Sequence, residues 1–330
     1  MTRNRFVPDW APHSHCWMAW ALHPEWGAAL GEVAEELRRI IVAIAEFEPV
    51  RLLTPRSLLG QAQAQAFGPN VEIVEAPVDD IWMRDIAPIY IARGSDVLPV
   101  DLNFNGWGAP RLRPPRPGDR LAGTARPLFG RTKLNAGFVA EGGAFVVGRD
   151  GVVFTTRSCL LNRNRNPQLS ETDIGRELIR LGASEVIWLD GDRYERITSG
   201  HVDGYLLPTE RGDLLVQSCE ADDPCAKARD ADIARLRSLT GLGAIRLVDP
   251  PRVSSSESNL FAATYVNVYT PNGAVIASKF GDLDRDRQAE RALAAGFPGR
   301  EVRMLSAPNI ARGGGGIRCL VQPVPAASSS

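Results

Sequence analysis

Histidine and cysteine are scarce in this chain, which has four histidines and five cysteines in 330 residues. The cysteines follow no spacing typical of a structural zinc site, and Cys219 and Cys225 do not form a Cys-x-x-Cys pair. We expect every cysteine to be a thiol in a reducing cytoplasm, and most of them to be simply buried. The cysteines are Cys16, Cys159, Cys219, Cys225 and Cys319.

Net charge and long apolar runs are also lacking. The formal net charge is −1, which gives no reason to expect nucleic acid or an anionic membrane as a partner. No stretch approaches the roughly 20 apolar residues needed to cross a bilayer. The polar segment 1–10 does not resemble a signal peptide. The cytoplasm is therefore the expected location.

What the chain does have is the composition of a soluble globular protein, with 44% hydrophobic and 23% charged residues. Amphipathic segments that predict helices alternate with short β-rich runs. The predicted helices are 28–46, 61–67, 170–181, 224–239 and 282–295, followed by predicted strands at 50–53, 71–74, 185–189, 244–248 and 301–305. Ser170 with Asp173 predicts an N-cap, and Gly296 predicts a C-cap.

Paired strands are predicted before several of these helices. The pairs are 144–147 with 152–156, 204–207 with 214–217, and 264–269 with 274–278, the last joined by the turn signal Pro271-Asn272-Gly273. A hairpin, a helix and a further strand therefore recur. This pattern is compatible with a closed ring of repeated units or with a doubly wound sheet, and it does not decide between them.

Five scattered residues form a complete set for one type of chemistry: Asp85, Glu141, His201, Asp203 and Cys319. The cysteine would be the nucleophile and the histidine a proton shuttle. The carboxylates would bind a cationic planar group, and a guanidinium fits best because its N–H fork matches carboxylate geometry. In a strand, His201 and Asp203 would share one face. The set predicts attack on a guanidinium carbon.

Each of these residues has a simpler interpretation when taken alone. A phosphate-binding loop at the glycine run 313–316 is excluded, because no Gly-Lys-Ser/Thr follows it. Cys319 alone would equally be a buried core cysteine, and His201 a hydrogen-bonded core histidine. Asp85 and Glu141 alone would be surface carboxylates.

A metal site is the competing interpretation of the N-terminal cluster His13, His15 and Cys16. Its spacing matches no known ligand set, and guanidine chemistry needs no metal, so we expect none here.

Short blocks around these residues recur in a known family. In order they are His-Ser-His-Cys-Trp-Met-Ala-Trp (13–20), Trp-Met-Arg-Asp (82–85), Asp-Leu-Asn-Phe-Asn-Gly-Trp-Gly (101–108), Glu-Gly-Gly (141–143), Leu-Leu-Asn-Arg-Asn-Arg-Asn-Pro (160–167), Gly-His-Val-Asp (200–203), Tyr-Val-Asn-Val-Tyr (265–269), Phe-Gly-Asp (280–282) and the glycine run before Cys319. With these blocks the sequence resembles the agmatine deiminase and bacterial peptidylarginine deiminase family of the guanidino-group-modifying superfamily.

The resemblance implies an α/β fold, a five-bladed α/β propeller (pentein) of repeated ββαβ-type units around a central polar site. Residues 1–325 would form a single catalytic domain, and 326–330 a disordered tail. It also implies a small guanidino substrate and no cofactor. It leaves undecided whether the protein forms a homo-oligomer.

The resemblance also implies roles for the site residues. Asp85 and Asp203 would hold the guanidinium nitrogens, and Glu141 would pair with His201 or with the substrate. Trp82 and Trp107 would line the channel for the substrate's aliphatic stem. The block 13–20 would pack at the rim of the site.

The implied reaction is hydrolysis through a covalent thiouronium on Cys319, releasing ammonia and a ureido product. Buried carboxylates without cationic partners are costly, so we expect raised carboxylate pKa values in an empty site. The alternatives on the same scaffold are a peptidylarginine deiminase, an amidinotransferase and a non-catalytic binding propeller.

Two further segments carry expectations. The family motif usually has His directly before the cysteine, and this chain has Arg318. In a strand Arg318 would point away from Cys319 into a structural ion pair; if it reached the pocket, it would repel agmatine's ammonium and favour another guanidine. The proline-rich segment 109–127 predicts an irregular surface loop, either edging the substrate entrance or only connecting elements.

Overall fold

The computed structural model describes residues 3–109, 113–130, 134–252 and 261–327. Their strands form five sheets, of which two have four strands, two have three and one has two. One sheet joins the two ends of the chain in the order β16 (Gln322–Pro325), β2 (His13–Ala19), β3 (Val50–Thr54) and β4 (Val71–Glu75). Within it β16 runs antiparallel to β2, while the β2–β3 and β3–β4 pairs are parallel.

The other four sheets repeat a similar plan. Their strands, in sheet order, are β1 (Asn4–Phe6), β5 (Ile89–Arg93), β6 (Asp96–Asp101) and β7 (Leu134–Asn135); β10 (Glu185–Leu189), β9 (Val152–Thr156) and β8 (Val146–Val147); β11 (Leu206–Pro208), β12 (Leu214–Gln217) and β13 (Ile245–Val248); and β14 (Ala274–Lys279) with β15 (Glu301–Ser306). Antiparallel hairpins β5–β6, β8–β9 and β11–β12 each gain a parallel third strand.

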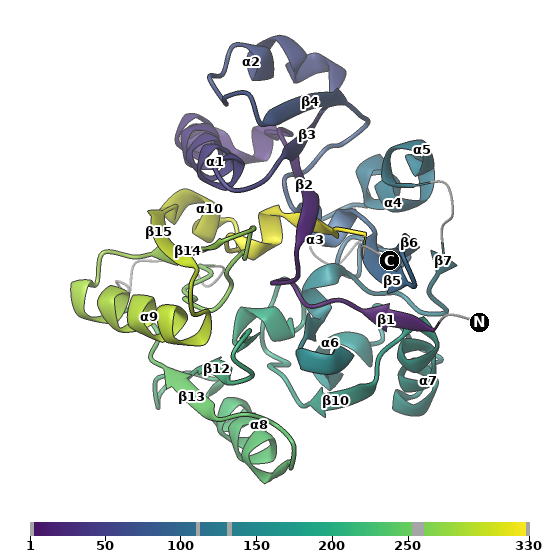
Figure 1. Ribbon diagram of the computed structural model, residues 1–330, viewed down its shortest axis with the longest axis vertical. Coiled ribbons are helices and arrows are strands. Elements are labelled where there is room, and N and C mark those ends of the chain that lie inside the picture. Colours follow the sequence, from purple (N-terminus) through teal and green to yellow (C-terminus); the bar gives the residue numbers. More distant parts are fainter. Residues whose placement is uncertain (1–2, 110–112, 131–133, 253–260, 328–330) are drawn as a thin grey trace.

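Helices connect the strands. They are α1 (Leu30–Ala45), α2 (Leu59–Gln63), α3 (Met83–Ile86), α4 (Leu121–Thr124), α5 (Arg126–Phe129), α6 (Arg157–Leu160), α7 (Glu171–Leu181), α8 (Ala226–Ser238), α9 (Leu283–Gly296) and α10 (Pro308–Arg312). Short 3-10 turns are η1 (Pro24–Ala29), η2 (Arg56–Leu58), η3 (Pro117–Arg120), η4 (Gly142–Ala144), η5 (Arg149–Gly151), η6 (Val202–Gly204) and η7 (Arg318–Leu320). Figure 1 shows the sheets around the middle of the molecule, where α3 lies, with α1, α7, α8 and α9 at the periphery.

The predicted alternation of hairpin, helix and strand is largely confirmed. Helix α7 begins with the predicted capping box, in which Ser170 accepts from the backbone N–H of Asp173 and the Asp173 carboxylate accepts from that of Ser170. The hairpin predicted at 264–269 is reduced to one bridge between Tyr269 and Ile276. Gly296 is the last residue of α9 rather than its C-cap, which is Phe297.

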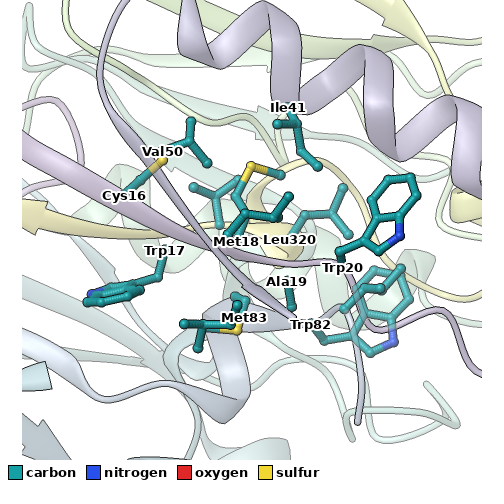
Figure 2. Close-up of a cluster of buried hydrophobic side chains, with 14 of the residues drawn as sticks. Cys16, Trp17, Met18, Ala19, Trp20, Ile41, Val50, Trp82, Met83 and Leu320 are labelled. Atoms are coloured by element: carbon teal, nitrogen blue, oxygen red, sulfur yellow. The ribbon is translucent and has the colours of Figure 1, made fainter. Parts of the chain in front are cut away.

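The largest hydrophobic cluster joins the first sheet to the middle of the molecule. Cys16 and Met18 of β2, and Trp20 directly after it, are buried with Ile41 of α1 and Leu320 of η7. Figure 2 shows these side chains together with Trp82 and Met83, which precede and begin α3. Because α3 packs into this core, its short turn has a fixed position.

The segment 109–127 corrects our expectation of purely irregular structure. Its described part contains η3 and α4, and α5 begins at its end. Pro117 stands in the first turn of η3, where a missing N–H costs nothing. Arg113 binds Asp119 and lies over the ring of Trp107, with 4.9 Å from its guanidinium carbon to the ring centroid. The segment therefore covers Trp107 as well as connecting sheets.

The C-terminal strand β16 is held in the first sheet beside β2, while the N-terminal strand β1 pairs with β5 in another sheet. Ala326, at the start of the predicted disordered tail, donates its backbone N–H to the Pro12 carbonyl at 2.7 Å. The rest of that prediction, residues 328–330, lies outside the described residues. Among the residues that the structure describes, no helix is long and apolar enough to cross a membrane.

Candidate active site

Four of the predicted site residues lie in or beside short helical turns that each precede a strand of a different sheet. Asp85 lies in α3 just before β5, Glu141 just before η4 and β8, and Asp203 in η6 before β11. Cys319 lies in η7 before β16. The turn α3 contacts η4 and η7, and η4 contacts η6, so the beginnings of these hairpins meet. A fold of repeated units thereby gathers residues far apart in the sequence.

Asp85 is buried and is held by two neutral donors. Its Oδ2 accepts from Trp107 Nε1 at 2.9 Å, and its Oδ1 accepts from the Gly143 N–H at 2.9 Å. Burial raises the pKa of Asp85; the charge of His201 lowers it, but burial together with the charges of Glu141 and Asp203 keeps the pKa above its ordinary value. The raised carboxylate pKa expected for an empty site is thus found at Asp85.

Glu141 behaves differently, and this corrects the expectation. Burial alone would raise its pKa, but the charge of Arg165 and hydrogen bonds from His201 and Arg165 outweigh burial and lower the pKa to about 2. Arg165 Nε lies 2.9 Å from Oε1 and 3.1 Å from Oε2 of Glu141. The carboxylate therefore has a cationic partner within the protein.

His201 is the second partner of Glu141. Its Nε2 lies 2.8 Å from Glu141 Oε1, which leaves Nδ1 as the nitrogen not bonded to Glu141. Burial alone would lower the pKa of His201, but interactions with Cys159 and Glu141 outweigh burial and raise the pKa well above its ordinary value. The imidazole is therefore held as an imidazolium at neutral pH.

His201 and Asp203 do come together, although not in the predicted strand. His201 precedes the 3-10 turn η6, because Ser199 and Gly200 have φ of 66° and 90° and turn the chain there. His201 Nδ1 lies 3.8 Å from Asp203 Oδ1. The left-handed Ser199 stores backbone strain two residues before His201.

Arg318 forms the structural ion pair that was one of the two alternatives. It lies in η7 rather than in a strand, and its Nη1 donates to Asp203 Oδ2 at 2.7 Å. Its Nε donates to Asp9 at 2.8 Å, and its Nη2 to the Phe145 carbonyl at 3.1 Å. With its side chain only 5% exposed, Arg318 does not reach the pocket.

Cys319 is partly buried at the cavity and lies beside Asn267. Its thiol donates to Asn267 Oδ1 at 3.5 Å, and Asn267 Nδ2 donates to the Asp203 carbonyl at 3.1 Å. Burial raises the pKa of Cys319, and the charges of Asp203 and Asp85 raise it further. These interactions favour the thiol form of Cys319, and a bound cation would favour the thiolate.

The glycine run before Cys319 allows Trp82 and Asn267 to pack closely against the backbone. A Cβ at Gly315 would lie 2.3 Å from the ring of Trp82, and one at Gly316 2.5 Å from Asn267 Oδ1. Trp82 thus packs against this run, and Trp107 donates its indole N–H to Asp85. Contact of either tryptophan with the substrate stays a prediction.

A cavity of about 690 Å³ opens onto this site. His201, Asp203 and Cys319 line it together with Gly314, Gly315 and Gly316. Cys219 and Cys225 also line it, and they form a disulfide instead of the two thiols we expected. The turn between them brings their Cα atoms to 6.7 Å, within the range that a disulfide spans.

Two groups of side chains have spacings compatible with a metal ion. In the first, atoms of Glu141, Cys159 and His201 lie within 4.8 Å of one another, but the Arg165 guanidinium and the imidazolium already bind that carboxylate. In the second, Cys219 and Cys225 share Asp223, but their sulfurs are bonded to each other.

His13 of the N-terminal cluster takes part in a hydrogen-bonded network. His13 binds Glu48 at 3.0 Å, and Tyr269 donates to the same carboxylate, which gives the block 13–20 a structural network.

Sequence reasoning missed three residues of the site: Arg165, Asn267 and Cys159. The first two lie in blocks quoted for the resemblance, 160–167 and 265–269, so the signal was their presence in a recurring block. Nothing in the sequence distinguishes buried Arg165 from exposed Arg163 in the same block.

Comparisons with known proteins identify the family. A family model described as Porphyromonas-type peptidyl-arginine deiminase matches residues 5–325. An agmatine deiminase of Stutzerimonas stutzeri is 34% identical over 354 residues, covering 96% of this chain and 94% of the relative. An agmatine deiminase of Pseudomonas putida is 34% identical over 352 residues, with 96% and 94% covered.

A solved structure of agmatine deiminase from Enterococcus faecalis has the same mixed α/β fold. It superposes with a TM-score of 0.91 at 25% identity, covering 98% of this chain and 96% of that one. The chain belongs to the Porphyromonas-type peptidyl-arginine deiminase family.

Proposed function

We propose that this protein is a guanidino-group deiminase, a hydrolase that acts on a C–N bond of a linear amidine and releases ammonia. The observation that carries the proposal is that a thiol, an imidazole and a carboxylate line the same cavity, at Cys319, His201 and Asp203. The agmatine deiminases among its relatives make agmatine the first substrate to test.

Binding would begin at the carboxylates. Asp85 and Asp203 accept the N–H groups of the substrate guanidinium, whose positive charge then lowers the pKa of the Cys319 thiol. Because His201 is already protonated, the Cys319 proton passes to solvent water, and the thiolate attacks the guanidinium carbon to form a C–S bond. The carboxylates stabilise the bound orientation, which places the carbon against sulfur.

Two proton transfers through His201 complete the reaction. Nδ1 of the imidazolium gives its proton to one nitrogen, the C–N bond breaks, ammonia leaves, and an S-alkylthiouronium remains on Cys319. The neutral imidazole then takes a proton from water as its oxygen attacks the same carbon. The C–S bond breaks with its electrons going to sulfur, the hydroxyl proton of the intermediate passes to that sulfur to restore the Cys319 thiol, and the ureido product leaves.

Arg318 gives no reason to reject agmatine. All three of its guanidinium nitrogens donate within the protein, to Asp9, to Asp203 and to the Gly142 and Phe145 carbonyls. Its charge is therefore neutralised by Asp9 and Asp203, and the repulsion of a substrate ammonium that would have favoured another guanidine is not expected.

The finer architecture follows from the repeated placement of the site. We take the five sheets as five blades of an α/β propeller, and residues 1–325 as one catalytic domain. The pairing of β16 with β2 supports both, because it joins the last strand to an early one as a closed ring requires. The cytoplasm stays the predicted location, and the reaction as written needs no cofactor.

The test is ammonia release from agmatine, free arginine, 4-guanidinobutyrate and a blocked arginine peptide, with Cys319→Ala as control. Release from agmatine that Cys319→Ala abolishes is the expected result. Release only from the blocked peptide would indicate a peptidylarginine deiminase, and turnover that needs an amine acceptor would indicate an amidinotransferase. No release from any of the four would contradict the proposal for these substrates.

A further inference from the structure

Arg165 is a fully buried arginine that does not line the cavity. Its side chain and that of Glu141 are both 0% exposed. Nε donates to both oxygens of Glu141, and Nη2 donates to Oε1 as well. A guanidinium that binds one carboxylate through two nitrogens fixes both the charge and the plane of that carboxylate.

The same Glu141 oxygen binds the imidazole. Oε1 accepts from Arg165 and lies 2.8 Å from His201 Nε2, so the three side chains form a continuous chain. Around His201 the other ionisable groups are Asp203, Asp85, Cys159 and, across the cavity, Cys319. Together with Glu141, Asp203 and Asp85 make three carboxylic acids around the imidazole, so a cation beside Glu141 decides whether all three can stay ionised.

Arg165 also holds the loop that carries His201. Its Nη2 donates to the Thr198 carbonyl at 2.9 Å, and its Nη1 lies 3.5 Å from Ser199 Oγ. Ser199 has a φ of 66°, a conformation that persists only where surrounding contacts hold it. The arginine therefore touches both the partner of the imidazole and the backbone that positions it.

We propose that Arg165 is a positioning residue of this enzyme, which keeps Glu141 ionised and thereby keeps His201 charged and oriented to protonate the departing nitrogen. The inference rests on the proposed function for the role of His201. Arg318 and Arg165 then have different roles. Arg318 neutralises Asp203, which would bind the substrate guanidinium, and Arg165 neutralises Glu141, which binds the proton donor His201.

The kinetic test compares Arg165→Gln with Arg165→Lys and with the control Arg163→Gln. Arg163 is exposed and lies two positions away in the same loop, so its replacement should leave turnover at the wild-type value. Arg165→Gln should lower kcat by roughly 10² to 10⁴, the range for lost acid–base catalysis, with a smaller change in KM. Arg165→Lys should recover part of kcat, because it restores the charge without the fork.

The direct test is an NMR titration of the imidazole nitrogens, which needs no substrate. With four histidines in the chain, His201 can be assigned by its loss in His201→Asn. In the wild type His201 should stay protonated well above the ordinary histidine pKa of about 6.5. In Arg165→Gln it should titrate at a lower pH, while in Arg163→Gln it should titrate as in the wild type.

Unchanged titration of His201 in Arg165→Gln would overturn the proposal, whatever happens to kcat. If Arg165→Gln does not fold, Glu141→Gln breaks the same chain from its other side with little change of shape. His201 should then titrate at a lower pH in Glu141→Gln, and an unchanged titration there would equally overturn the proposal. Failure of the wild type to release ammonia would count against the proposed function and not against this linkage.

Discussion

At the scale of single residues, the three site carboxylates differ in what neutralises them. Glu141 binds Arg165, and Asp203 binds Arg318, whereas Asp85 has only the N–H groups of Trp107 and Gly143. Within the described parts of the chain, no arginine, lysine or histidine forms an ion pair with Asp85. A substrate cation would therefore gain most of its charge stabilisation from Asp85.

Asp85→Asn removes that charge with little change of shape. We expect kcat/KM for the guanidine substrate to fall on the order of 10² to 10³, the effect of breaking a buried ion pair worth about 3–5 kcal/mol. Steady-state ammonia release measures it. The matched control is Asp150→Asn, an exposed carboxylate outside the site, which should keep the wild-type kcat/KM. Wild-type efficiency in Asp85→Asn would refute this role.

The protonation of Cys319 gives a second residue-scale prediction. Burial, with Asp203 and Asp85, raises the pKa of this thiol, so at about pH 8 it should hold less thiolate than an exposed cysteine with a pKa of about 8.5. Alkylation of Cys319 by neutral iodoacetamide should be slow and should still accelerate with rising pH. A cationic haloamidine should react faster, because its charge beside the carboxylates favours the thiolate.

Peptide mass spectrometry across the pH range follows the adduct on Cys319 separately from the other cysteines. Rapid alkylation by iodoacetamide that does not change between about pH 6 and pH 8 would mean a thiolate in the empty site, against the burial argument.

At the scale of elements, the sequence predicts what has periodicity or a cap. The strand 185–189 has the bounds of β10, and the Ser170 cap begins α7, because these features depend on local patterns. The site turns have no such pattern. Ser199 and Gly200 break the strand expected at His201, and three residues of η7 hold Cys319.

The glycine run before η7 is the element whose replacement should disturb Cys319 most specifically. A Cβ at Gly315 would meet the Trp82 ring at 2.3 Å, whereas one at Gly60 of α2 would meet nothing within 4 Å. We expect Gly315→Ala to cost about 1–3 kcal/mol of unfolding free energy, as overpacking does, and to lower kcat as well. Gly60→Ala should do neither.

Urea unfolding and ammonia release measure the two effects. If Gly315→Ala keeps both the wild-type stability and the wild-type kcat, Trp82 is not packed against the run as described.

At the scale of the whole molecule, ion pairs join segments that lie far apart in the sequence. Asp9 near the start binds Arg84 and Arg318, and Arg318 binds Asp203. The blocks in their order indicated which residues share a site. They did not indicate which arginines neutralise it, because such pairings join residues as far apart as Asp203 and Arg318 and leave no local pattern.

These pairs predict how stability depends on pH. Burial alone would raise the pKa of Asp9, but Arg318 and Arg84 outweigh burial and lower it to about 2, and Glu141 is likewise at about 2. A carboxylate with a lowered folded-state pKa stabilises the fold above its unfolded pKa of about 4 and loses that contribution as the pH falls toward 2. The unfolding free energy should therefore fall steeply in this range.

Urea unfolding at several pH values between about 6 and 2.5 measures this loss. Asp9→Asn should start less stable at pH 6 and should lose less on acidification, because one of the linked carboxylates is gone. The same acid slope in Asp9→Asn and the wild type would show that Asp9 is not held ionised by the arginines.

The most direct test of the central claim is a rapid acid quench during turnover of agmatine, followed by mass spectrometry of the peptide that contains Cys319. The account predicts a transient adduct with the mass of the substrate less ammonia, on Cys319 and absent from Cys319→Ala. Ammonia release that persists in Cys319→Ala, or an adduct on another residue, would contradict it.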